Sequence, residues 1–198
     1  MAWFMMKYNP DVHRRKSIRL KDYDYSQAGA YFITICIHKK ECVLGEVADD
    51  GMKLSRFGEV VKTEWLKTFE IRKNLILDEY IVMSNHFHGI IIVDGRGTLQ
   101  RAPTFEKFGR PISNSVPTVV RLFKSATTNQ VNQSRNTPRR PFWQRNYFEH
   151  IIRNEDELNK IREYIQNNPL KWHLDRENPG RVAGYELEDE IFRHFKKV

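Results

Sequence analysis

The apolar residues of this chain gather in short runs whose spacing predicts strands and helices. Residues 31–38 are rich in β-branched and aromatic side chains, which predicts a strand, and we expect residues 41–47 to pair back against it. Asp50 and Gly51 form a turn signal, so a further short strand is expected at 52–54. This part of the chain is therefore predicted to be β structure.

A helical period begins at Ser55, which is a good N-cap residue, and runs to about residue 70. Its inward stripe is predicted to contain Val61, Trp65, Leu66 and Phe69. Residues 75–84 and 86–93 follow as two strands, or as one strand that bends where the histidines lie.

The middle of the chain is predicted to hold a long loop and a helix. The loop covers residues 94–115, and a loop of that length in a compact domain is usually functional or mobile. The helix covers 118–130, with Arg121 and Lys124 facing outward. Residues 132–141 are polar and basic, and they predict a flexible connector.

A further strand is predicted at residues 142–152. On a strand, Trp143, Arg145 and Tyr147 would share one face and mix aromatic with cationic groups, a combination that suits contacts with unstacked bases. Ordinary sheet packing is the alternative reading of that face. His150 falls on the opposite face, where we expect a structural role.

The last predicted helix covers residues 154–168. Asn154 is a good N-cap, and Glu157 three residues later completes a capping-box pattern. Leu158, Ile161 and Ile165 form the apolar stripe. The helix ends before Pro169, whose ring disfavours helical geometry in the preceding residue.

This order of elements predicts an α+β fold, with a ferredoxin-like antiparallel sheet and helices packed on it. We expect a basic N-terminal arm over residues 1–24, one domain over 25–175, and a C-terminal tail over 176–198 that packs on the outside or flanks the domain. Arm residues expected to contact nucleic acid are Arg14, Arg15 and Lys16.

The positive charge of the chain is concentrated in one segment. The net charge is +8, and residues 96–145 hold ten Lys or Arg but one acid, Glu106. Outside this segment acids and bases almost balance, so the excess lies between the two regions that carry candidate chemistry. A localised basic stretch is typical of nucleic-acid binding. The expected contacts are Arg121, Lys124, Arg139, Arg140, Trp143 and Arg145.

Two histidines, at 86 and 88, are separated by one residue in a predicted strand. Side chains alternate faces along a strand, so both imidazoles point the same way, as two ligands of one metal ion would. A half-buried strand with two satisfied histidines is the alternative. Tyr164 and Asn168, four residues apart, share one face of the last helix. By itself this second pair is better explained by structure: Tyr164 widens the apolar stripe and Asn168 ends the helix beside Pro169.

Together these pieces resemble the REP-associated tyrosine transposases, within the HUH superfamily of single-strand DNA endonucleases. The segment His86-Phe87-His88 matches the HUH motif, and residues 164–169 match the segment that carries the tyrosine nucleophile. Residues 19–32, 123–128 and 142–153 match as well, and the resemblance spans roughly residues 14–180. A departure is Ser84, where many relatives have proline.

The resemblance implies that Tyr164 attacks a DNA phosphate and forms a 5′-phosphotyrosine link beside a hairpin. It implies a divalent metal site made of His86, His88 and, less firmly, Asn168. Oxygen ligands suit Mg²⁺ and imidazoles suit Mn²⁺, so we expect either ion to serve and Mn²⁺ to bind more tightly. The implied partner is single-stranded DNA with hairpins, and a homodimer is compatible with the family.

An alternative function is a catalytically silent protein of the same fold that binds hairpin DNA or RNA. The intact pair of histidines and the intact tyrosine favour the enzyme. The sequence has no run of about 20 apolar residues that would cross a membrane and no signal-peptide pattern, so we expect a cytoplasmic protein. Cys36 and Cys42 fit that compartment as free thiols.

Overall fold

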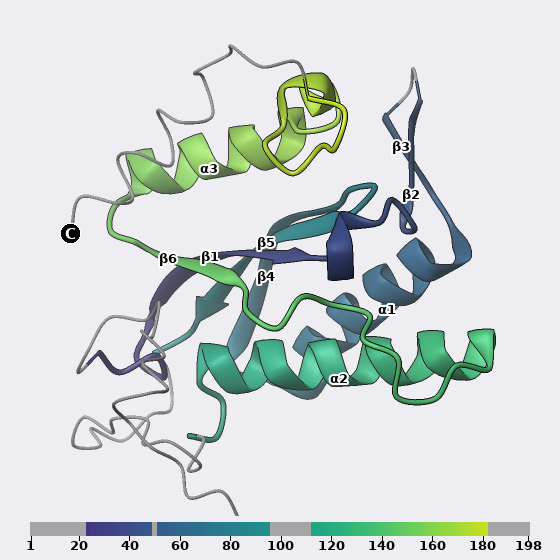
Figure 1. The fold of residues 1–198 in the computed structure, drawn as a ribbon. Coiled ribbons are helices and arrows are strands. Elements are labelled where there is room, and N and C mark those ends of the chain that lie inside the picture. Colours follow the sequence, from purple (N-terminus) through teal and green to yellow (C-terminus); the bar gives the residue numbers. More distant parts are fainter. Residues whose placement is uncertain (1–22, 49–50, 96–111, 182–198) are drawn as a thin grey trace, which may run out of the picture.

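The computed structural model of the chain describes residues 23–48, 51–95 and 112–181 (Figure 1). Its strands are β1 (Gly29–Cys36), β2 (Gly45–Ala48), β3 (Gly51–Leu54), β4 (Leu75–Val82), β5 (His86–Val93) and β6 (Phe148–Ile152). Its helices are α1 (Arg56–Ile71), α2 (Val116–Arg135) and α3 (Glu155–Asn167), with 3-10 turns η1 (His38–Lys40) and η2 (Trp172–Leu174).

The main sheet has the order β4-β5-β1-β6, and all its neighbouring strands are antiparallel. Helices α1 and α2 cover one face and α3 covers the other (Figure 1). The series β1-α1-β4-β5-α2-β6 gives the ferredoxin-like arrangement, to which α3 is added on the second face. The predicted α+β class and ferredoxin-like sheet are confirmed.

Strand β5 serves both faces of the sheet. Its odd-numbered residues Phe87, Ile91 and Val93 lie in the core beneath α1 and α2, where Trp65 and Phe123 pack against Phe87. Its even-numbered residues face α3. The core on that side contains Phe32, Ile90, Ile152, Leu158, Ile161, Tyr164 and Ile165. The sheet thus separates two apolar layers, and the histidines belong to the α3 layer.

Helix α3 is held over the sheet by its cap, its apolar stripe and one ion pair. Asn154 accepts a hydrogen bond from the backbone N–H of Glu157 at 2.9 Å, as the N-cap pattern predicts. On the far side of the helix, Arg162 reaches β4 and donates from Nε and Nη2 to the two oxygens of Asp78, at 2.9 and 2.6 Å. A two-pronged contact of this kind fixes orientation as well as distance.

Two of the predicted strands are wrong. Residues 41–47 do not pair with β1, because β2 pairs with β3 in a separate two-stranded sheet. Residues 142–147 are not a continuous strand: β6 begins at Phe148, and Trp143 makes an isolated bridge to Ile37. The sequence did not decide between two strands and one bent strand around the histidines. The structure has two strands, β4 and β5.

Other differences concern lengths and unplaced segments. Helix α2 runs to Arg135, into the segment predicted as a connector, and it ends at Asn136 in the left-handed conformation. The arm residues Arg14, Arg15 and Lys16, most of the 94–115 loop and the tail beyond 181 lie outside the described residues. The predicted domain boundaries therefore stay a prediction. Within the described ranges, no helix is long and apolar enough to cross a membrane.

Candidate active site

The two histidines of β5 face each other on the α3 side of the sheet. His86 and His88 are 0% and 1% exposed, and their Nε2 atoms are 2.9 Å apart. The prediction that both rings share one face is therefore confirmed. Two imidazole nitrogens at this separation are placed to bind the same ion.

The outer nitrogen of His86 is held by Asn85. The Asn85 amide nitrogen donates to the backbone carbonyls of Lys40 and Glu177, at 3.2 and 2.7 Å, so its oxygen remains as an acceptor. That oxygen lies 2.9 Å from Nδ1 of His86, which must then carry the proton. Nε2 of His86 is left as a bare lone pair directed into the site.

The outer nitrogen of His88 contacts a hydroxyl of β1. Thr34 Oγ1 lies 2.9 Å from Nδ1 of His88, and a hydroxyl can either donate or accept. With its proton on Nε2, His88 donates to His86 and Nδ1 accepts from Thr34; with its proton on Nδ1, it donates to Thr34 and Nε2 presents a second lone pair to a cation. Outer-shell contacts of this type orient the imidazole ligands of metal sites.

Burial keeps both rings neutral. Desolvation lowers the pKa of His86, and the nearby carboxylates of Asp175 and Glu177 oppose this shift in part. Desolvation also lowers the pKa of His88 well below its usual range, with a further contribution from His86. Neutral imidazoles need lose no proton before they bind a metal ion at pH 7.

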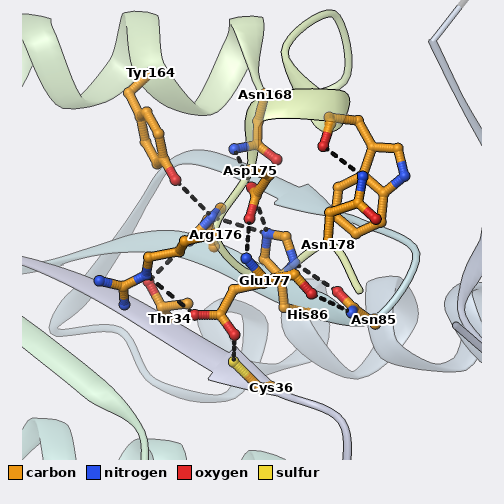
Figure 2. A network of polar contacts seen from close by, with 12 residues as sticks. Thr34, Cys36, Asn85, His86, Tyr164, Asn168, Asp175, Arg176, Glu177 and Asn178 are labelled. Atoms are coloured by element: carbon orange, nitrogen blue, oxygen red, sulfur yellow. Dashed lines mark hydrogen bonds and ion pairs between the residues drawn. The ribbon is translucent and has the colours of Figure 1, made fainter. Parts of the chain in front are cut away.

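Tyr164 points from α3 toward the histidines (Figure 2). Its hydroxyl lies 3.3 Å from Nε2 of His88. Its ring packs edge-on against Phe32, with ring centroids 6.2 Å apart and planes at 86°. The side chain is 9% exposed, so packing and the helix together fix the phenol beside the imidazoles. The close approach expected of the tyrosine and the histidines is present within one chain.

Asn168, at the end of α3, reaches the same site through a residue that the sequence analysis missed. Its side chain is 1% exposed, and Nδ2 donates to Oδ2 of Asp175 at 3.0 Å. The same Asp175 oxygen lies 3.6 Å from Nε2 of His86. Oδ1 of Asn168 is buried and has no hydrogen-bond partner among the residues the structure describes.

The segment after Pro169 covers the site. The Trp172 ring lies 5.9 Å from the His86 ring, centroid to centroid, and the segment continues through Asp175 to Glu177 (Figure 2). Glu177 accepts a hydrogen bond from the thiol of Cys36 at 3.3 Å and pairs with Lys40 at 3.1 Å.

The thiols take no part in a disulfide. Cys36 and Cys42 are both free, as predicted. Burial and the neighbouring Glu177 raise the pKa of Cys36 to about 12, so this thiol stays protonated and acts as a hydrogen-bond donor.

Three buried side chains form a group that fits a metal ion. His86, His88 and Asp175 each offer one ligand atom, and these atoms all lie within 4.8 Å of one another. Two imidazole nitrogens and a carboxylate oxygen suit divalent transition ions, and the buried, unpartnered oxygen of Asn168 lies on an amide that contacts this group. The donor set therefore fits the divalent ion that the resemblance implies.

Several residues predicted to bind DNA line one groove, of about 320 Å³, between α2 and residues 141–145. Trp143, however, is 5% exposed and donates from Nε1 to Thr127 Oγ1 at 2.7 Å. It packs between Phe123 and Phe142. Packing, the alternative that the sequence left open for this face, therefore holds for Trp143, because the chain folds this segment onto α2 before β6 begins.

Lys124 is also turned inward. Its ammonium donates to the backbone carbonyls of Gln144 and Arg145, at 2.7 and 3.1 Å, and burial lowers its pKa to about 8. It therefore braces the 144–145 backbone, against the prediction that it faces out. Exposed residues of the predicted set are Arg121, Arg139, Arg140 and Arg145.

His150 has the structural role that its strand position suggested. It is 7% exposed, and its Nε2 lies 2.8 Å from a carboxylate oxygen of Glu157. The other oxygen of Glu157 accepts from the backbone N–H of Arg153 at 2.7 Å. The contact joins β6 to the first turn of α3.

Comparisons with known proteins relate part of the chain to a family and its fold to a solved structure. The family of IS200-like transposases matches residues 108–168. An uncharacterised protein of Haemophilus influenzae is 41% identical over 177 residues, which cover 86% of this chain and 96% of that protein. A REP-associated tyrosine transposase bound to a REP hairpin has a similar fold, with a TM-score of 0.55 and 14% identity over 91% of this chain and 88% of that one. Part of the chain, including Tyr164 and Asn168, thus matches the IS200-like transposase family, and the fold of the chain is similar to that of a REP-associated tyrosine transposase.

Proposed function

We propose that this protein cleaves and rejoins single-stranded DNA beside hairpins through a 5′-phosphotyrosine intermediate. The observation that carries the proposal is the Tyr164 hydroxyl, 3.3 Å from Nε2 of His88 and within the same buried layer as His86. The similar transposase is bound to a REP hairpin, which supports hairpin DNA as the partner of this chain.

In the first step the Tyr164 oxygen attacks the phosphorus of the target strand. The new phosphorus–oxygen bond forms to tyrosine, the bond to the 3′-oxygen breaks, the phenol loses its proton and the departing strand gains a 3′-hydroxyl. A 3′-hydroxyl then attacks the phosphotyrosine in the reverse sense and restores a phosphodiester. The two steps exchange bonds of similar energy, so no external energy source is needed.

His86 and His88 would hold a divalent ion, Mg²⁺ or Mn²⁺, with Asn168 as the third ligand that the family suggests. When bound, the ion supplies positive charge that stabilises the phosphate in the transition state. The remaining work falls to the protein. Phe32 and the helix orient the phenol, and Asn85 and Thr34 orient the two imidazoles.

The exposed arginines would guide the DNA backbone. Arg121 and Arg145 lie at the groove beside α2, and Arg139 and Arg140 lie on the loop that follows this helix. Guanidinium groups bind phosphate in a paired geometry and raise the rate of encounter with DNA. Sequence recognition requires further contacts with the bases.

The test is a covalent trapping experiment. The purified protein is incubated with 5′-labelled and 3′-labelled hairpin-bearing single strands in Mn²⁺, and the products are separated on a denaturing gel. We expect the fragment that begins at the cut to migrate with the protein, and the other fragment to carry a free 3′-hydroxyl. Binding without any covalent product, over a panel of hairpins with flanking sequence, would favour the catalytically silent alternative.

A further inference from the structure

We propose that Asp175 is a ligand of the cation held by His86 and His88, so that this site contains two imidazoles and a carboxylate. The inference rests on the proposed function and extends its metal site to a residue outside the family motifs. Asp175 is 1% exposed, and its Oδ2 lies 3.6 Å from Nε2 of His86. The three side chains form the buried group described above.

The carboxylate of Asp175 is buried without a permanently charged base beside it in the described residues. In the described part of the chain, His86 is the one basic side chain within ion-pair distance of its carboxylate. Lys40 and Arg176, whose charges act on His86, both pair with Glu177, each at 3.1 Å. A buried carboxylate without a full positive charge beside it is destabilising. A divalent ion between the carboxylate and the imidazoles removes that cost.

The polar contacts of Asp175 leave it oriented toward the histidines. Oδ1 accepts from the backbone N–H of Glu177 at 2.6 Å, which fixes the plane of the carboxylate. Oδ2 accepts from Nδ2 of Asn168 at 3.0 Å and is the oxygen nearest His86. Asn168 therefore acts on Asp175 as a positioning residue, whether or not its own oxygen also reaches the ion. A carboxylate held in this way adds a hard ligand and a negative charge to two neutral imidazoles.

The ligand would also couple the ion to the covering segment. Asp175 lies in the turn that follows Trp172, and Asn178 ties the turn together by donating from Nδ2 to the Trp172 carbonyl at 2.9 Å. Binding of the ion then holds residues 172–178 against β5. Backbone amides of this segment are expected to exchange hydrogen more slowly in Mn²⁺ than in its absence.

The test measures binding of Mn²⁺ chloride to the full-length protein by calorimetry, without DNA. Asp175→Asn keeps the shape and an oxygen for the Glu177 amide but removes the charge. We expect its Kd for Mn²⁺ to rise by at least roughly 10-fold, because loss of even an outer-shell partner of a metal ligand typically costs about 10–100-fold in affinity. Asp156→Asn, which changes an exposed acid in the first turn of α3, is the matched control and should bind as the parent does.

Hydrogen exchange supplies the second measurement. Mn²⁺ should protect residues 172–178 in the parent and in Asp156→Asn, and not in Asp175→Asn. If Asp175→Asn fails to fold by circular dichroism, Asp175→Glu keeps the charge on a longer arm and should also weaken Mn²⁺ binding. The proposal is overturned if Asp175→Asn binds Mn²⁺ within twofold of the parent, or if the parent binds no Mn²⁺.

The outcomes separate this inference from the proposed function. Mn²⁺ binding that depends on Asp175, without any covalent DNA product, would support the ligand and reject the strand transferase. Covalent products together with Mn²⁺ binding that is indifferent to Asp175 would do the reverse.

Discussion

Replacing Tyr164 by phenylalanine removes one oxygen and leaves the ring in place. The ring contributes packing to Phe32 and His88, at centroid distances of 6.2 and 5.2 Å, and these contacts survive the change. The lost contact with His88 is 3.3 Å long and joins two neutral groups. Nε2 of His88 keeps its 2.9 Å contact with His86, so no buried nitrogen loses its last partner.

The expected cost in stability is small for these reasons. A neutral hydrogen bond contributes about 1 kcal/mol, and a long one contributes less. For a domain of this size, about 1 kcal/mol lowers Tm by roughly 2–4 °C. Domains are typically stable by about 5–15 kcal/mol, so Tyr164→Phe should remain almost entirely folded at 25 °C.

The effect of Tyr164→Phe on the formation of covalent DNA adducts should be far larger than its effect on stability. Without the phenol oxygen no phosphotyrosine link can form, and we expect covalent DNA adducts to fall below detection, at least ~1000-fold. Such a loss corresponds to about 4 kcal/mol of transition-state free energy, which a change of about 1 kcal/mol in stability cannot produce. Binding of hairpin DNA should stay within a few-fold of the parent.

The assay compares adducts on a denaturing gel with melting temperatures for the same preparations. Tyr147→Phe is a matched control, because its hydroxyl donates a shorter hydrogen bond to Glu149, 2.6 Å long, in β6. That variant should lose as much stability or more and yet form adducts normally. Adducts formed by Tyr164→Phe at the parent rate would show that another residue is the nucleophile.

Three further results are expected. Gly89→Ala would place a methyl group 2.8 Å from the Trp65 ring, so urea denaturation should show a loss of about 1–3 kcal/mol. Gly180→Ala should cost little, because its methyl group would meet Oδ1 of Asn178 at an ordinary contact distance of 3.5 Å. Burial lowers the pKa of both site histidines in the folded protein. Below about pH 6.5, these histidines are therefore protonated in the unfolded chain and still neutral in the folded one. Stability of the metal-free protein should then fall by up to about 1.4 kcal/mol per pH unit for each histidine, and melts that are flat from pH 7.5 to 5.5 would contradict this sign. Arg139→Ala combined with Arg140→Ala should reduce the slope of log K against log salt for DNA binding by ~2, and an unchanged slope would exclude both from phosphate contact.

Local rules explain which parts of the site the sequence predicts. The boundaries of α3 follow from Asn154 and Pro169, and the common face of the histidines follows from strand periodicity. The position of Tyr164 over His88 is different, since the two are 76 residues apart. Periodicity places Tyr164 on one face of its helix and His88 on one face of its strand. Only the family resemblance indicated that these two faces meet.

The misses share a physical cause. Asp175 follows Pro169 in a stretch without helical or strand period, and only the tertiary fold brings it to β5. The density of turn-forming residues around it is the one local signal, and that signal predicts a turn without saying what the turn covers. The burial of Trp143 could not be derived from strand alternation, because this residue forms an isolated bridge outside a regular strand.

The alternation of His86, Phe87 and His88 places the imidazoles on one face of β5 and a core phenylalanine on the other. A shift of one residue in the pairing of β5 would push both imidazoles into the apolar layer under Trp65 and present a phenylalanine to Tyr164. Misregistered chains would therefore lose their core and their chemistry in the same event. Under the proposed function, a chain misfolded in this way would be both unstable and unable to cleave DNA.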